Sequence, residues 1–218
     1  VFYFSGNSNY LVEISKETEY VTGLPEEMGG SGDPSPWTAR GILEGIRACA
    51  EQKFEGYELD RLRILIQGVG HVGFALAELL HQQKSQLLIS DTNVQLLSKA
   101  QKTFKAEVIA PESIYSTEVD IFSPCALGGI INEKTLHELR CWIVAGGANN
   151  QLDPETEMDQ KLFEKGILYA PDYILNAGGL INIYVREILK EKDPMPWIKK
   201  IGNNLREIFK LSAQEGIG

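Results

Sequence analysis

Short apolar runs alternate with amphipathic stretches between residues 35 and 185, and this alternation limits the possible folds more than any other feature. The runs with the composition of buried strands are RILIQG, SQLLISD, AEVIAP, VDIFSPCA, RCWIVAGGANN and GILYAPDYILNAGG. Apolar residues at helical spacing occupy several of the stretches between them. Because parallel strands need a crossover connection, usually a helix, the pattern predicts an α/β fold with a doubly wound parallel sheet of the Rossmann type.

The first expected helix follows a loop dense in glycine and proline, GLPEEMGGSGDPSPWTA. Ser35 is expected to cap this helix, with Pro36 in its first turn and an end near Gln52. Near the other end of the chain, Pro194 and Pro196 interrupt the pattern before a terminal amphipathic helix. The apolar stripe expected on that helix consists of Ile198, Ile201, Leu205 and Ile208.

The composition excludes some classes of partner. A formal net charge of −9 and a pI near 4.9 argue against a nucleic-acid or anionic-membrane partner. No apolar run is long enough to span a bilayer, and the start lacks the features of a secretory signal. The cysteines Cys49, Cys125 and Cys141 are too few and scattered for a disulfide framework or zinc cluster, so we expect reduced thiols in a cytoplasmic protein. The isolated histidines give no metal-binding spacing.

A glycine motif, Gly68-x-Gly70-x-x-Gly73, lies between an apolar strand and an amphipathic helix. In a dinucleotide-binding loop, the first glycine permits a tight turn, the second lets the pyrophosphate approach, and the third lets helix pack on strand. The free N–H groups of the helix start would then bind the phosphates. His71 and Val72 lie inside the motif. His71 could contact the pyrophosphate, although an exposed side chain at a helix start is the simpler interpretation.

Asp91 follows the motif by about twenty residues, at the end of the second expected strand. A carboxylate there can accept hydrogen bonds from both ribose hydroxyls of NAD and repels the 2′-phosphate of NADP. Thr92 follows it and no arginine is adjacent, which favours NAD. The alternative is that Asp91 merely caps the next helix.

Three further loops follow expected strands and combine small residues with asparagines: residues 123–129, 145–152 and 176–182. In doubly wound sheets, ligands bind outside the carboxyl ends of the strands. Small residues would let a cofactor lie close to the backbone. Asn149, Asn150 and Asn176 could donate to a carboxamide or carboxylate while accepting from an amine. Alternatively, these asparagines and glycines are only turn residues.

Five segments together resemble the leucine/phenylalanine/valine dehydrogenases, relatives of glutamate dehydrogenase: GGSGDPSPWTARGI, GVGHVG, SPCALGGIIN, AGGANNQL and YAPDYILNAGGLIN. The resemblance covers roughly residues 17–190, in the family's order. It implies NAD-dependent oxidative deamination of a hydrophobic L-amino acid, such as leucine, another branched-chain amino acid or phenylalanine. The products would be the 2-oxo acid and ammonium, and the full-length enzyme would be a homo-oligomer.

The same resemblance implies residue roles. Thr38 would hydrogen-bond the nicotinamide carboxamide, and Leu180 and Ile183 would line an aliphatic side-chain pocket. The expected cofactor contacts are Thr38, Gly68, Gly70, His71, Val72, Gly73, Asp91, Thr92, Cys125, Ala126, Leu127 and Asn149. The expected substrate contacts are Asn150, Asn176, Leu180 and Ile183.

The chain also departs from the family. Nothing matches the GGGK block that carries a substrate-binding lysine, and VFYFSGNSN stands where the family has an aspartate in an EDVGT-like segment. We therefore expect no catalytic residue in this chain, with residues 1–34 a remnant or linker of a substrate domain. Residues 35–190 would form the NAD-binding domain and residues 191–218 a truncated terminal helix. The alternatives are a non-catalytic NAD-binding paralogue and, less favoured, a different Rossmann oxidoreductase.

Overall fold

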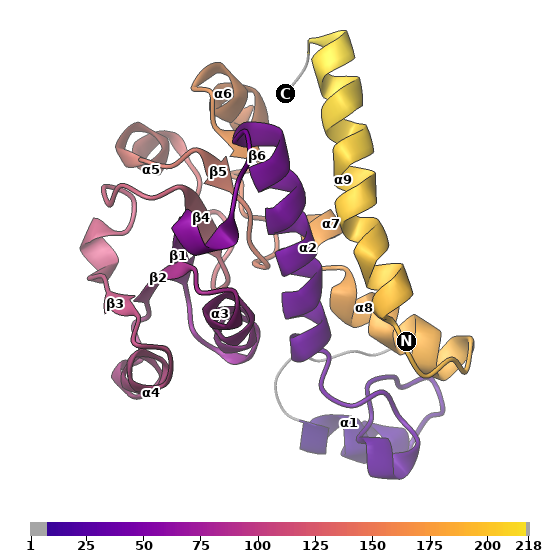
Figure 1. Ribbon diagram of the computed structural model, residues 1–218. Coiled ribbons are helices and arrows are strands. Elements are labelled where there is room, and N and C mark those ends of the chain that lie inside the picture. Colours follow the sequence, from indigo (N-terminus) through magenta and orange to yellow (C-terminus); the bar gives the residue numbers. More distant parts are fainter. Residues whose placement is uncertain (1–7, 217–218) are drawn as a thin grey trace.

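The structure, a computed structural model, describes residues 8–216 and contains one parallel sheet (Figure 1). The strand order is β3-β2-β1-β4-β5-β6, and every neighbouring pair is parallel. The strands are β1 (Arg63–Gln67), β2 (Gln86–Ser90), β3 (Glu107–Val108), β4 (Ile121–Pro124), β5 (Ile143–Val144) and β6 (Leu168–Tyr169). Each falls in a predicted run, so the predicted fold class is confirmed. The order reverses between β1 and β4, which opens a crevice at their carboxyl ends.

Both faces of the sheet are buried, which explains why its strands are continuous apolar runs rather than alternating ones. In β1, Ile64, Leu65 and Ile66 are all fully buried. Ile64 and Ile66 belong to one core cluster and Leu65 to the other, because successive side chains point to opposite faces.

Helices cover the two faces unequally (Figure 1). One face carries α2 (Ser35–Lys53), α3 (His71–Gln82), α4 (Val94–Phe104) and α9 (Met195–Glu215). The other carries the shorter η3 (Pro111–Ser113), α5 (Glu133–Glu138) and α6 (Met158–Glu164). The remaining short elements are η2 (Leu59–Arg61), α7 (Asp172–Leu175), α8 (Gly178–Ile183) and the π-helical turn η4 (Tyr184–Ile188). No helix within residues 8–216 is long and apolar enough to cross a bilayer.

The long helices α2 and α9 lie side by side (Figure 1). A Cβ atom on Gly41 of α2 would lie 2.9 Å from Cδ1 of Ile201 and 2.8 Å from the carbonyl oxygen of Leu175. Glycine at this position therefore lets α2 approach both α9 and α7. The predicted α9 stripe is mostly confirmed, since Ile198, Ile201 and Leu205 are buried, but Ile208 is only half-buried and Phe209 completes the face.

The amino-terminal piece contains α1 (Ser8–Ser15) and η1 (Glu26–Met28), and it lies beyond the start of α2 (Figure 1). Glu187 of η4 fixes it there, because its Oε1 accepts backbone hydrogen bonds from Gly23 at 3.0 Å and Ser31 at 2.8 Å. Most of the divergent segment VFYFSGNSN, residues 1–7, lies outside the described residues.

The predicted cap of α2 was wrong. The helix begins at Ser35 itself, so the residue at its N-cap is Pro34, which has no side-chain capping hydrogen bond. Instead, Oδ1 of Asp33 accepts the backbone N–H of Ser35 at 2.9 Å. An ionised carboxylate is the stronger acceptor for a free N–H at a helix start, so the acid two residues earlier takes this role.

Candidate functional site

The glycine loop follows β1 and leads into α3 at the carboxyl edge of the sheet. Gly68 has φ +91°, a conformation that favours glycine, and its N–H donates to the carbonyl of Ser90 at 2.7 Å. A Cβ on Gly68 would lie 2.6 Å from Cβ of Ala126, and one on Gly73 would lie 1.9 Å from the oxygen of Gly68. The fold itself therefore requires both outer glycines.

Gly70 differs from the other two glycines. Its φ of −69° suits any residue, and an added Cβ would meet nothing within 4 Å. The protein's own packing thus does not require glycine here, and the open space lies at the amino end of α3. Unpaired N–H groups at a helix start attract phosphate. The free space and the donors together fit a pyrophosphate that approaches the backbone closely.

Asp91 is joined to the glycine loop. Its Oδ2 accepts the N–H of Val69 at 2.7 Å, and its Oδ1 accepts the N–H of Asn93, also at 2.7 Å. The cap of α4 is Asn93, whose side chain accepts backbone hydrogen bonds from Gln95 and Leu96. The carboxylate of Asp91 remains half-exposed beside the loop, and Thr92 next to it is exposed.

His71 brings a further loop to this site. Its side chain is 69% exposed, and Nδ1 lies 3.8 Å from Oδ2 of Asp33. The segment before α2 therefore borders the glycine motif, a proximity that no sequence spacing showed. Val72 is partly buried against the core and lies beside Gly147, because a Cβ added to Gly147 would be 3.3 Å from its Cγ1.

The loops after β4 and β5 interlock. A Cβ on Gly128 would lie 2.5 Å from the oxygen of Asn149, and one on Gly146 would lie 2.2 Å from the oxygen of Pro124. The N–H of Gly129 donates to the carbonyl of Asn150 at 2.7 Å. The small residues therefore serve loop-to-loop packing, whether or not they also accommodate a ligand.

The other candidates on the β4 loop are Ala126, Leu127 and Cys125. Ala126 and Leu127 are both exposed, Leu127 at 73%, and Ala126 lies against Gly68. Cys125 is half-buried, and burial raises the pKa of its thiol despite opposing hydrogen bonds from Gly147 and Ser123. The thiol is therefore protonated at neutral pH and is not an activated nucleophile.

The asparagines come together across two loops. The side-chain N–H of Asn176 donates to Oδ1 of Asn149 at 2.7 Å. Asn150 has φ +52°, which suits a turn residue, and its N–H donates to Oδ2 of Asp172 at 2.5 Å. The turn-residue alternative thus describes the backbone of Asn150, but it does not account for the contact between Asn149 and Asn176.

Thr38 lies near the start of α2, and Leu180 and Ile183 lie in α8. The hydroxyl of Thr38 donates to the carbonyl of Pro34 at 3.1 Å, and a Cβ on Gly179 would lie 2.6 Å from that hydroxyl. The NAGG segment therefore packs directly on Thr38. Leu180 is 70% exposed, whereas Ile183 is 5% exposed and lies in the interior.

Sequence reasoning missed two residues of this region. Gln151 is fully buried and donates to the carbonyls of Gly146 and Ala148. It thereby shapes from inside the loop of residues 145–152, called the asparagine loop below. Asp172 binds the same loop from outside. The signal for Asp172 was present, since it follows β6 closely, as Asp91 follows β2. Among residues 8–216, no three His, Cys, Asp or Glu side chains lie close enough together to hold a metal ion.

A six-stranded parallel sheet with order 3-2-1-4-5-6, a glycine turn after β1 and an acid after β2 define a protein of the Rossmann class. The sequence model of the Glutamate/Leucine/Phenylalanine/Valine dehydrogenase family matches residues 87–215. The chain belongs to this family, and the resemblance seen in the sequence is confirmed.

Individual members of the family also match this chain. Leucine dehydrogenase of Thermoactinomyces intermedius is 42% identical over 206 residues, which are 94% of this chain and 56% of that protein. Phenylalanine dehydrogenase of Bacillus thermotolerans is 45% identical over 178 residues, 79% of this chain and 46% of that protein. The crystal structure of L-tryptophan dehydrogenase from Nostoc punctiforme superimposes with a TM-score of 0.85 at 39% identity, over 97% of this chain and 60% of that one. The chain thus spans about half the length of these relatives, from 46% to 60%.

Proposed function

We propose that this chain is the cofactor-binding part of an NAD-dependent dehydrogenase of hydrophobic L-amino acids. The observation that carries the proposal is the open space at Gly70, bordered by the start of α3 and by the carboxylate of Asp91. NAD⁺, when bound, accepts a hydride from the substrate. The overall reaction converts an L-amino acid, water and NAD⁺ into a 2-oxo acid, ammonium, NADH and a proton.

The chain's own residues bind and orient the reactants. The N–H groups at the start of α3 bind the pyrophosphate. Asp91 accepts hydrogen bonds from the ribose hydroxyls and repels a 2′-phosphate, which favours NAD over NADP. Thr38 and Asn149 bind the nicotinamide carboxamide, with Ala126 and Leu127 beside the cofactor. His71, Val72, Thr92 and Cys125 complete the proposed cofactor contacts.

The substrate would lie next to the nicotinamide, between the asparagine loop and α8. Asn150 and Asn176 have the donors and acceptors for its carboxylate and amine. Leu180 would form part of the wall around its side chain, with Ile183 behind it. The relatives are named for leucine, phenylalanine and tryptophan. An apolar pocket gives only modest selectivity per methylene, so we propose the hydrophobic class rather than one amino acid.

The proposal extends to the organisation of the chain. Residues 1–34 would be a remnant or linker of the substrate domain, residues 35–190 the cofactor domain and residues 191–218 the truncated terminal helix. The enzyme would be a cytoplasmic homo-oligomer, and its free thiols suit a reducing compartment.

Proton transfer to and from the amine and water requires acid–base groups. No lysine occurs in the segments that border the site, which are residues 31–40, 68–73, 91–93, 123–130, 145–152 and 170–183. We therefore expect the 218-residue chain to bind NADH but to oxidise L-leucine, L-phenylalanine and L-tryptophan slowly or not at all. Rapid turnover by this chain alone would contradict the proposal.

The absence of lysine in those segments also favours a second candidate, a non-catalytic NAD-binding module. A chimera separates the two, in which the amino-terminal part of the Thermoactinomyces leucine dehydrogenase precedes this chain. Amino-acid-dependent NADH formation by the chimera supports the dehydrogenase. NADH binding without turnover in a folded chimera supports the module, and turnover of 2-hydroxy acids in place of amino acids indicates another Rossmann oxidoreductase.

A further inference from the structure

The single helical turn α7 holds the asparagine loop at two points. At its first residue, the carboxylate of Asp172 accepts the backbone N–H of Asn150 at 2.5 Å. Directly after its last residue, the side chain of Asn176 donates to Oδ1 of Asn149 at 2.7 Å. The position of α7 therefore sets both the backbone and one side chain of the loop.

The loop needs such support because of its backbone conformation. Asn150 has φ +52°, and residues other than glycine adopt this region only where their surroundings stabilise it. From inside, buried Gln151 donates to the carbonyls of Gly146 and Ala148. From the neighbouring loop, Gly129 donates to the carbonyl of Asn150. The bond to Asp172 is the one in this set with an ionised partner, and charge-assisted hydrogen bonds are the stronger kind.

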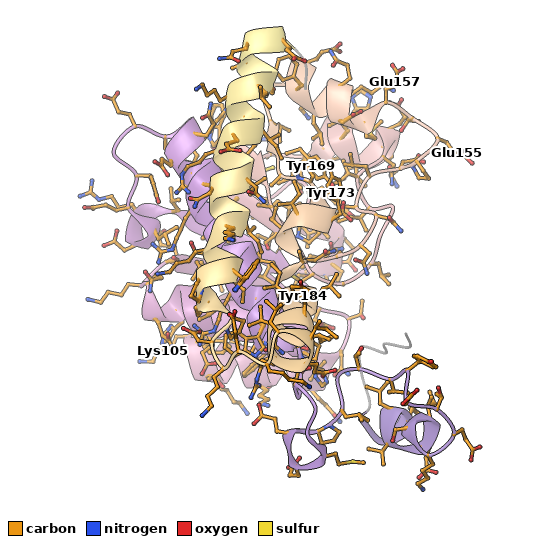
Figure 2. The ribbon with its side chains drawn as sticks, turned by 90° about the vertical axis from the view of Figure 1, so that its right-hand side faces the viewer. Lys105, Glu155, Glu157, Tyr169, Tyr173 and Tyr184 are labelled. Carbon is orange, nitrogen blue, oxygen red and sulfur yellow. The ribbon has the colours of Figure 1, made fainter. Side chains whose placement is uncertain are left out.

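Asp172 is itself held by a neighbour. The hydroxyl of Tyr169, at the end of β6, donates to Oδ1 of Asp172 at 3.3 Å, so the two carboxylate oxygens have separate partners. Burial and the adjacent Asp172 charge raise the pKa of Tyr169, which keeps its hydroxyl protonated as a donor. Tyr169 and Tyr173 lie near one another beside α9 in Figure 2. Both line a cavity of about 970 Å³ that Asp172, Asn150 and the exposed Asp159 of α6 also border.

We infer that Asp172 is a positioning residue of the site: its carboxylate, oriented by Tyr169, fixes Asn150 and thereby places the amide of Asn149 for the nicotinamide end of the cofactor. This inference rests on the proposed function, since it concerns the same site. Asp172 would touch neither the cofactor nor the substrate, yet it would control the asparagine loop, which would touch both.

The test compares two ligands that differ only in the nicotinamide. NADH and ADP-ribose share the adenosine, the pyrophosphate and the second ribose, so both use the glycine loop and Asp91. We expect Asp172→Ala to weaken NADH binding at least about fivefold while the dissociation constant of ADP-ribose stays within about twofold, because the loss is confined to one charged hydrogen bond and the loop it holds. Calorimetric titration of the purified chain gives both constants.

Further variants keep the test decisive. Asp172→Asn retains a neutral acceptor and Tyr169→Phe removes only the orienting hydroxyl, so both should give smaller losses of NADH affinity in the same direction. Asp159→Asn removes the same charge from the same cavity and should change neither constant. Equal weakening of both ligands by Asp172→Ala and Asp172→Asn, or no change in either, would overturn the inference. If the unaltered chain binds neither ligand, the proposed function fails first.

Discussion

The carboxylate of Asp91 accepts the backbone N–H of Val69 at 2.7 Å and so joins the end of β2 to the glycine loop. This bond holds the acid beside the open space at Gly70. A carboxylate has about four lone-pair positions, and the hydrogen bonds from Val69 and Asn93 use two of them. The remaining positions are available for ribose hydroxyls.

Replacement of this acid tests the assigned cofactor preference. We expect Asp91→Asn to weaken NADH binding roughly tenfold, since a charged acceptor becomes neutral. NADPH should lose less or gain, because the repulsion of its 2′-phosphate disappears. Parallel titrations with both cofactors measure the ratio, and an unchanged ratio would show that Asp91 does not select between them.

Gly73 and Gly70 should behave differently when each is replaced by alanine. Gly73→Ala should lower the free energy of unfolding by about 3 kcal/mol or more, because the new Cβ would overlap the oxygen of Gly68. Gly70→Ala should change it by less than about 0.5 kcal/mol, because the new Cβ meets nothing.

The same Gly70→Ala variant should lose most of its NADH affinity, since its methyl group would occupy the space proposed for the pyrophosphate. Denaturant unfolding and NADH titration on each variant separate folding from binding. Full NADH affinity in a stable Gly70→Ala protein would place the pyrophosphate elsewhere.

The sequence predicted the sheet because each strand is a local apolar run, and the glycine motif because its spacing is local. The contacts that complete the site depend on tertiary packing. Nothing in the sequence pairs Asn176 with Asn149 or His71 with Asp33, because loop conformation decides which side chains meet across the crevice. Burial of Ile183 and exposure of Leu180 likewise follow from how α8 docks on α2, which periodicity over six residues cannot show.

Two buried thiols give a prediction about pH. Burial raises the pKa of Cys141 to about 12, despite opposing effects of backbone hydrogen bonds and Lys165, and raises that of fully buried Cys49 well above its ordinary 9.0. Above pH 9, the unfolded chain therefore releases thiol protons that the folded chain keeps. Stability is then lost as pH rises, by up to about 1.4 kcal/mol per pH unit for each thiol.

Denaturant unfolding between about pH 8 and pH 10 measures this slope. The Cys49→Ala variant is the matched control, since it should show a shallower decline whatever its stability at neutral pH. A slope that is unchanged by this substitution would show that Cys49 does not contribute to it.

We propose that the carboxyl edge of this sheet binds NAD in preference to NADP. Titration of the purified 218-residue chain with NADH and, separately, NADPH tests it most directly. We expect saturable binding of one NADH per chain, with a lower dissociation constant than that of NADPH. No saturable NADH binding by the folded chain, or tighter binding of NADPH, would contradict it.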